Sequence, residues 1–323
     1  MIATRDAYGE ALVALGKENP NVVVLDADLS GSTKTEKFFK AYPERFFNAG
    51  IAEANMMGMA AGLALSGKTV FVSTFAVFAT GRAYDQIRQS IAYTKANVKI
   101  VATHAGLTVG PDGGSHQALE DIAIMRAVPD MTVIVPCDGN QTKEAVNVAA
   151  AYDGPVYIRL GREPVPTVLP EGTRFEIGKG LILSPEITRE ELLVRTAGEP
   201  LYDVAFVACG VMVKAALEAA EALEKEGRKC LVADFASVKP LDEELLGAIA
   251  KSSRAIVTSE EHSIIGGLGS AVCESVAARH PIPVTRVGVE DVFGQSGKAG
   301  ELLRAYGLTA GDLVAAARQV AGL

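Results

Sequence analysis

An acidic residue, Glu53, stands immediately before a long apolar run. Residues 54–65 are all apolar or glycine except for one asparagine. Because a helix that is apolar on all sides is buried, this run predicts a buried helix with a carboxylate at its positive, N-terminal end. A strand-like segment follows, and then come Phe75 and Phe78, three residues apart. The sequence therefore groups an acid, a buried helix and two aromatic rings within one short stretch.

This grouping suits the binding of a heteroaromatic ring. Burial raises the pKa of a carboxyl group, which favours an acid that exchanges protons with a ligand nitrogen. Two phenylalanine rings offer a flat apolar surface for stacking. The aminopyrimidine of thiamine diphosphate requires both features. The ordinary structural interpretations also stand, because a glutamate in a first helical turn is usually only a dipole partner, and phenylalanines at this spacing usually pack in a core.

Composition limits the class of protein. A chain of 323 residues is long enough for two domains with ample core, and 49% hydrophobic with 22% charged residues is typical of a globular protein. The net charge of -8 argues against a nucleic acid or a membrane surface as partner. The four cysteines show no CxxC spacing, which indicates reduced thiols. With neither a signal-peptide pattern nor an apolar run of ~18 residues, we expect a cytoplasmic protein.

Short β-branched runs alternate with helical patterns along the whole chain. This alternation predicts an α/β fold with parallel sheets covered by helices on both faces. Three prolines and a glycine in REPVPTVLPEG indicate a linker. We therefore expect a first domain at 1–163, a linker and surface excursion at 164–202, and a second domain at 203–323. Strands are expected at 22–25, 69–73, 98–102, 132–136, 156–160, 204–208, 230–234, 255–259 and 283–289, and helices at about 4–17, 52–66, 81–94, 117–127, 140–151, 211–227, 241–251, 266–279, 299–306 and 309–321.

Polar and glycine-rich loops follow several of the predicted strands. Ligands of open α/β sheets bind beyond the carboxyl ends of the strands. The loop THAGLTVGPDGGSHQ follows one strand and contains His104, Asp112 and His116, and Arg162 follows another. Glycine-rich backbone together with basic side chains predicts a phosphate-binding edge. Each feature alone is weak, because Ser115 could cap a helix and Arg162 could be a surface charge.

Five short motifs occur in order along the chain: ADL-x-x-S at 27–32, G-I-x-E at 50–53, TF-x-x-F at 74–78, TH followed by G-x-DG-x-SHQ within 103–117, and FG-x-SG at 293–297. Together they resemble the transketolase family, in which a pyrimidine-binding domain precedes a C-terminal domain. The resemblance covers most of the chain. It implies that this chain corresponds to the C-terminal half of a transketolase, made as a separate subunit.

The resemblance also implies a role for each matched residue. It places Glu53 on the aminopyrimidine of thiamine diphosphate, Phe75 and Phe78 against its ring, and Asp28 near the cofactor at a subunit interface. It places Asp112 and His116 on substrate hydroxyls, and Arg5, Ser32, His104 and Arg162 on the substrate phosphate. It further makes Glu53, His104 and His116 the catalytic groups that move protons.

The sequence departs from the family pattern at two positions and also lacks one of its motifs. Gly81 stands where a third cofactor-site aromatic is expected, and Gly114 stands where a proline is usual. The family's metal motif, GDG with a distal asparagine, is missing, and CDGN at 137–140 is interpreted as a strand-end turn and helix cap. The resemblance therefore implies no metal site here, and a separate N-terminal subunit that holds the diphosphate and Mg²⁺. A homodimer core within an α2β2 assembly is expected.

The implied reaction transfers a two-carbon ketol unit from a ketose phosphate to an aldose phosphate. Three alternatives stay open. The RAYDQ, SEEH and GGLGS segments are also similar to deoxyxylulose-phosphate synthases. The first alternative is therefore that this chain is one half of such a synthase. The β subunits of 2-oxoacid dehydrogenases share the architecture but lack the GPDGGSHQ loop. A non-catalytic assembly scaffold is the alternative outside enzymes.

Overall fold

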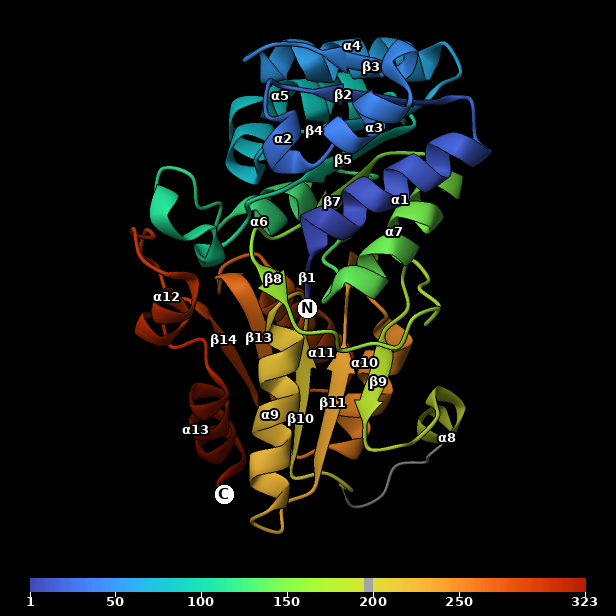
Figure 1. Cartoon of the computed structure of the whole chain (residues 1–323). Helices are drawn as coiled ribbons and strands as arrows, with labels where there is room; N and C mark the ends of the chain where they lie inside the picture. Colours follow the sequence, from blue (N-terminus) through green and yellow to red (C-terminus); the bar gives the residue numbers. More distant parts are fainter. Residues whose placement is uncertain (195–199) are drawn as a thin grey trace.

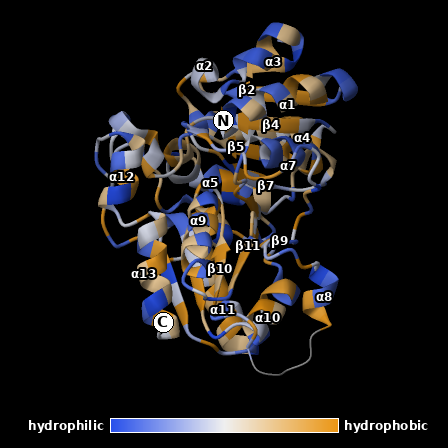
Figure 2. Ribbon diagram, turned by 60° about the horizontal axis from the view of Figure 1, so that its bottom comes forward, coloured by the Kyte–Doolittle hydropathy of each residue, from blue (hydrophilic) through white to orange (hydrophobic). Residues whose placement is uncertain are grey.

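The computed structural model describes residues 1–194 and 200–323, which form two α/β units, one above the other in Figure 1. Each unit is built on one open, largely parallel sheet. The predicted fold class is therefore confirmed. Figure 2 shows hydrophobic residues along the inner strands of the second unit, while the outer helices carry hydrophilic residues as well.

The first unit contains a seven-stranded sheet with the order β12-β6-β7-β5-β4-β2-β3. Its strands are β2 (Val22–Asp26), β3 (Phe46–Asn48), β4 (Thr69–Ser73), β5 (Val98–Ala102), β6 (Thr132–Ile134), β7 (Val156–Arg159) and β12 (Ser237–Lys239). Every neighbouring pair is parallel except β12 with β6. Strands β2 and β5 are buried along their whole length, which explains why their sequences show no polar alternation.

Helices cover both faces of this sheet. On one face lie α1 (Thr4–Glu18) and α7 (Gly139–Ala151), which contact one another, and on the other lie α4 (Glu53–Leu65) and α6 (Asp121–Ala127). An apolar cluster lies on each face of the sheet, and alternate residues of β2 belong to one or the other. Val22 and Val24 face α1, while Val23 and Leu25 face α4. Shorter elements complete this unit: β1 (Ile2–Ala3), α2 (Ser30–Thr33), α3 (Glu36–Ala41), η1 (Pro43–Arg45), α5 (Tyr84–Gln86) and β8 (Pro164–Val165).

The second unit contains a five-stranded sheet with the order β14-β13-β10-β11-β9. Its strands are β9 (Leu181–Ser184), β10 (Val204–Ala208), β11 (Cys230–Asp234), β13 (Ile256–Ser263) and β14 (Val284–Val289). Only β9 runs antiparallel to its neighbour. The surrounding helices are α8 (Arg189–Leu193), α9 (Met212–Glu224), α10 (Glu243–Ser252), α11 (Leu268–Arg279), α12 (Ala299–Ala305) and α13 (Ala310–Ala321). Helices α9 and α13 pack together on one face and α10 and α11 on the other.

Short edge strands connect segments that the sequence analysis treated separately. Strand β8 pairs with β1 in a separate two-stranded sheet, and β9 pairs with β11 at the edge of the five-stranded sheet, so the predicted linker at 164–202 contributes two strands. Strand β12 crosses back to pair with β6 of the first unit. Residues 195–199 of the predicted excursion lie outside the described residues, and the predicted domain boundaries stay a prediction. No described helix is long and apolar enough to cross a membrane.

Two predicted helices differ from the structure. The helix expected at 81–94 is replaced by two π-helical turns, Phe78–Arg82 and Ile87–Ala92, on either side of α5. The helix expected from residue 117 begins at Asp121. The reason for the later start is that Gln117 donates to the carbonyls of Leu107 and Gln295, and so belongs to a loop contact instead.

Helix α4 is the clearest correction. The prediction of a helix buried on all sides is wrong for the single chain. Met56, Met57 and Ala60 are fully buried, but Gly58 and Gly62 lie on an exposed face where an added Cβ would meet no atom within 4 Å. An apolar helix therefore covers the sheet with one side and presents its other apolar side outward.

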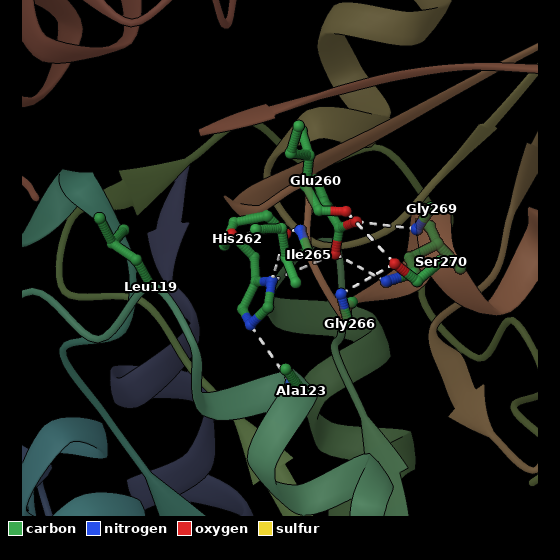
Figure 3. Close-up of polar contacts among 12 residues, drawn as sticks. Leu119, Ala123, Glu260, His262, Ile265, Gly266, Gly269 and Ser270 are labelled. Atoms are coloured by element: carbon green, nitrogen blue, oxygen red, sulfur yellow. Dashed lines mark hydrogen bonds and ion pairs between the residues drawn. The ribbon is translucent and has the colours of Figure 1, made fainter. Parts of the chain in front are cut away.

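The second unit contacts the first through buried polar groups at the end of β13. His262 accepts a hydrogen bond from the backbone N–H of Ala123 in α6, at 3.3 Å (Figure 3). Glu260 accepts from the backbone N–H of Gly269 at the start of α11, at 2.8 Å. Arg159 at the end of β7 donates to the backbone carbonyl of Glu261, at 2.9 Å. The contacts of His262 and Arg159 hold the carboxyl end of β13 against α6 and β7 of the first unit, and the contact of Glu260 ties it to α11 of its own unit.

Candidate active site

Glu53 is the first residue of α4 and its side chain is only 3% exposed. Its Oε1 accepts a hydrogen bond from Nη1 of Arg82 at 2.7 Å. The N-terminus of a helix carries partial positive charge, so this end of α4 also favours the carboxylate. The structure therefore places a buried acid where the sequence predicts one, and gives it a cationic partner that the sequence analysis did not identify.

The predicted aromatic pair is present and belongs to a larger ring cluster. The centroids of Phe75 and Phe78 lie 5.8 Å apart with an interplanar angle of 14°. Phe75 stacks on His104 with centroids 3.8 Å apart, and His116 meets the Phe78 ring edge-on at 5.4 Å. Phe75 is buried, whereas Phe78 is partly exposed. Phe78 therefore presents the open aromatic surface, and Phe75 supports it.

His104 lies at the centre of the site in a left-handed backbone conformation, with φ of 57°. Its side chain is 3% exposed, and its Nδ1 lies 2.8 Å from Oγ1 of Thr103. Burial, with a further contribution from the positive charges of Arg5 and Arg162, lowers the pKa of His104 to about 3. The imidazole is therefore neutral at physiological pH, with Nε2 directed toward Arg5 at 3.5 Å.

Arg5 joins the residues predicted to bind phosphate. Its Nη1 donates to the carbonyl of Ser32 at 2.9 Å, and its Nε donates to the carbonyl of Arg162 at 3.0 Å. Together with the contact to His104, these bonds bring all four predicted residues side by side. Arg5 is 157 positions from Arg162 in the sequence. The contacts with Ser32 and Arg162 are made to their backbone carbonyls. Two guanidinium groups and an imidazole in one place are suited to binding a dianion.

Asp112 and His116 lie in the loop on the open side of this set. Oδ1 of Asp112 is 3.5 Å from Nη1 of Arg162, and Nδ1 of His116 is 3.0 Å from Oγ of Ser115. Ser115 thus contacts His116 and does not cap a helix, since the cap position of α6 is Glu120. Asp28 contacts a different residue: its side chain is exposed, its backbone φ is 64°, and its Oδ1 accepts a hydrogen bond from Asn48 at 3.0 Å.

The two glycines that the sequence analysis singled out have different surroundings. A Cβ on Gly114 would lie 2.6 Å from the carbonyl oxygen of Gly294, so a side chain there would collide with the backbone of the FGQSG segment. A Cβ on Gly81 would meet no atom within 4 Å. The absence of a third aromatic at Gly81 therefore leaves open space beside Phe78.

Sequence reasoning missed one more residue that positions the site. The carboxylate of Glu261 accepts from the backbone N–H of Thr108 at 2.5 Å and lies 3.2 Å from its Oγ1. Thr108 belongs to the 3-10 segment Leu107–Asp112 that carries the substrate-loop residues. The SEEH string contained Glu261, but 153 positions separate it from Thr108, so no local pattern could reveal the contact.

The residues fit an aminopyrimidine but not a metal-bound diphosphate. A buried acid beside an open aromatic face satisfies both requirements of the ring. Within the described parts of the chain, no three histidine, cysteine, aspartate or glutamate residues are grouped to hold a metal ion. Asp138 of the CDGN string accepts from the backbone N–H of Gln141 and caps α7, as predicted.

Comparisons with known proteins match the chain over nearly its whole length. The transketolase pyrimidine-binding domain matches residues 1–167, and the transketolase C-terminal domain matches residues 198–313. A protein of Methanocaldococcus jannaschii described as a transketolase C-terminal section is 52% identical over 307 residues, which are 94% of this chain and 92% of that protein. A 6-deoxy-6-sulfo-D-fructose transketolase subunit from a Clostridium species is 41% identical, with 98% and 94% covered.

Solved structures give the same match. A structure described as a split gene transketolase, an inactive beta4 tetramer, superimposes with a TM-score of 0.89 at 55% identity and covers 100% of this chain and 99% of that one. The transketolase of Leishmania mexicana superimposes with a TM-score of 0.79 at 27% identity. There the match covers 99% of this chain but only 46% of the longer transketolase chain.

Proposed function

This chain belongs to the transketolase family, and we propose that it is the C-terminal subunit of a split transketolase that transfers a two-carbon ketol unit from a ketose phosphate to an aldose phosphate. Relatives of the same length support the subunit assignment, because they include one subunit of a 6-deoxy-6-sulfo-D-fructose transketolase and one subunit of an apulose-4-phosphate transketolase. These two relatives are named for different substrates.

The observation that carries the proposal is half of a cofactor site. Glu53 and Phe78 present an acid and an aromatic face at one end of α4, where they would hold the aminopyrimidine of thiamine diphosphate. When bound, that cofactor supplies the electron sink for breaking and forming a carbon–carbon bond beside a carbonyl group. The task of Glu53 is to hold or release a proton at the ring nitrogen, and the stacked Phe75 keeps Phe78 in place.

The remaining residues would bind and orient the sugar phosphate. Arg5, Ser32, His104 and Arg162 form one cluster of donors, so we assign them to the terminal phosphate. Because the pKa of His104 is lowered to about 3, this imidazole can donate or accept a hydrogen bond without carrying charge. Asp112 and His116 lie next to this cluster, where they would contact substrate hydroxyls, and His104 and His116 would move protons. Asp28 would act at the interface with another subunit.

The other half of the site would come from a different chain. We infer a separate N-terminal subunit that holds the diphosphate and Mg²⁺ and joins a dimer of this chain in an α2β2 assembly. Two observations support this inference. The described residues offer no group of metal ligands, and a relative of nearly identical length is described as an inactive tetramer of β chains.

Calorimetry tests the proposal. Thiamine diphosphate and Mg²⁺ are titrated into the purified chain, and then into the chain mixed with an N-terminal transketolase subunit. Heat of binding and ketol transfer are expected only in the mixture. Micromolar cofactor binding together with ketol transfer by this chain alone would refute the split-enzyme assignment.

A further inference from the structure

Arg82 makes two contacts at once in the free chain. Its Nη1 donates to the buried carboxylate of Glu53 at 2.7 Å, and its guanidinium carbon lies 4.5 Å from the centroid of the Phe78 ring. A guanidinium group is planar, stacks on aromatic faces and donates to carboxylates. These two contacts are the same two that an aminopyrimidine would make, with the acid at its edge and the phenylalanine against its face.

We propose that Arg82 occupies the pyrimidine pocket in the free subunit, and that thiamine diphosphate must displace its side chain in order to bind. The inference rests on the proposed function, because it takes Glu53 and Phe78 as the pyrimidine site. It adds a residue that sets cofactor affinity and that the family resemblance did not supply.

The burial of Glu53 explains why a cationic partner such as Arg82 stabilises the free subunit. Its side chain is 3% exposed, and a buried carboxylate without a partner is strongly destabilising. A subunit made separately must fold before a second chain brings the rest of the cofactor site. Arg82 gives Glu53 a cationic partner during that period, and the cofactor later takes over the hydrogen bond.

The surroundings allow Arg82 to leave. Its side chain is 53% exposed, so solvent can receive the guanidinium group when it swings away. Gly81, which precedes it, has open space where the family pattern predicts an aromatic side chain. No bulky neighbour at that position therefore confines the arginine, and the cluster of Phe75, Phe78 and His104 can stay in place while it moves.

Displacing Arg82 has a measurable cost. Cofactor binding must break a charge-assisted hydrogen bond and a cation–π contact, both weakened by the exposure of the arginine. Removing the arginine removes this competition. We expect Arg82→Ala to bind thiamine diphosphate on the order of tenfold more tightly, which corresponds to about 1.4 kcal/mol.

The experiment measures the dissociation constant of thiamine diphosphate, at saturating Mg²⁺, for the chain assembled with an N-terminal transketolase subunit. Wild type, Arg82→Ala and Arg82→Lys are compared. Arg88→Ala is the matched control, because Arg88 is exposed and also lies in the irregular helical segment after Phe78. The expected order of affinity is Arg82→Ala tightest, then Arg82→Lys, with wild type and Arg88→Ala equal and weakest, since lysine can pair with Glu53 but stacks less well.

Thermal unfolding of the free chain gives a second, cofactor-independent measurement. Arg82→Ala should lower the Tm by about 2–4 °C in the presence of Glu53 and by much less in a Glu53→Gln background, because the pair is already broken there. Equal shifts in the two backgrounds would overturn the pairing.

Two outcomes of the binding experiment would also overturn the proposal. Unchanged affinity in Arg82→Ala would mean that the arginine does not compete, and weaker affinity would make it a permanent wall of the pocket. If wild type and all variants bind no cofactor in the mixture, the proposed function itself fails, and this inference fails with it. Tight wild-type binding with no effect of Arg82→Ala removes this inference alone.

Discussion

At the scale of single residues, Glu53 combines two properties that are seldom found together in a side chain without function. It is almost completely buried, and its carboxylate pairs with Arg82, a half-exposed cation that also lies over the Phe78 ring. A buried acid next to an open aromatic face is the arrangement that the proposed aminopyrimidine site requires. His104 is a second buried titratable group of the site, and burial together with nearby positive charge lowers its pKa to about 3.

The role of Glu53 is tested by Glu53→Gln in the assembled enzyme. We expect the exchange of the reactive carbon-bound proton of thiamine diphosphate to slow by ~10²-fold or more, the usual effect of losing an acid–base group. NMR of proton exchange measures this rate directly. Glu218→Gln, on the exposed side of α9, is the control. An unchanged rate in Glu53→Gln would leave Glu53 as a helix-end charge only.

The predicted phosphate site is tested at Arg162. Loss of one charge-assisted hydrogen bond costs about 1.5–3 kcal/mol, so Arg162→Ala should raise the KM of a phosphorylated acceptor by roughly ten- to a hundredfold. The unphosphorylated analogue should show little change. Arg174→Ala removes the same charge from a side chain that is 84% exposed and serves as the control. If both substrates are affected equally, Arg162 is a structural residue that holds the carbonyl of Val109.

At the scale of elements, the end of β13 positions the substrate loop. The carboxylate of Glu261 binds the backbone of Thr108 and packs against Gly106, where a Cβ would collide with it. Arg159 and Asp121 are the other charged groups that face this carboxyl. Burial raises the pKa of Glu261 to about 7, although Arg159 and the two hydrogen bonds from Thr108 oppose the shift. Strand β13 of the second unit therefore positions the loop of the first unit that contains Thr108.

This contact predicts a specific pH dependence of stability. Glu261 keeps its proton in the folded state up to about pH 7, whereas the unfolded chain loses it near the ordinary value of 4.5. The folded state binds more protons between these two values, so stability from this residue is complete below pH 4.5 and is lost as the pH rises through about 7. Each pKa unit of difference between the folded and unfolded states corresponds to about 1.4 kcal/mol, so the stability lost over this range is on the order of 3 kcal/mol.

The measurement is the free energy of unfolding of wild type and Glu261→Gln between pH 4.5 and 8. The glutamine cannot titrate, so the stability of wild type relative to the variant should fall over this range and then level off. Glu244→Gln, an exposed residue of α10, is the control and should parallel wild type. A wild-type curve parallel to that of Glu261→Gln would show that Glu261 is ionised throughout.

The elements that sequence alone predicted are those with a strong local signal. Strands such as β4 and β10 are buried β-branched runs, and their predicted and observed bounds agree. The edge strands β9 and β12 were missed because each contains only three or four residues, and their pairing partners are remote in sequence. The same limit applies to the site: Glu53 had a local signal, whereas the contacts of Arg82 and Glu261 depend on the folded arrangement.

At the scale of the whole molecule, the outward face of α4 is an apolar surface without a cover in the single chain. Met59 and Leu65 are 36% and 67% exposed, and Ile51, just before the helix, is 77% exposed. Gly58 and Gly62 leave this face flat, so that another backbone could approach closely. Glu53 begins the same helix. An interface on this face would therefore lie directly beside the predicted cofactor site.

This arrangement predicts that α4 lies at a subunit interface of the assembled enzyme. Gly62→Arg should leave the fold of the single chain intact, because the added side chain would meet no atom within 4 Å at its Cβ. In an apolar interface the same arginine would be buried without a partner, at a cost of roughly 2 kcal/mol or more, which weakens association at least about 30-fold. Light scattering after size-exclusion chromatography, with and without the N-terminal subunit, measures the loss of assembly.

Gly247→Arg provides the matched control, since Gly247 is also a helical glycine with open space around its Cβ, on α10 of the other unit. Normal assembly of Gly62→Arg would exclude this face of α4 from the interface and leave its apolar residues unexplained.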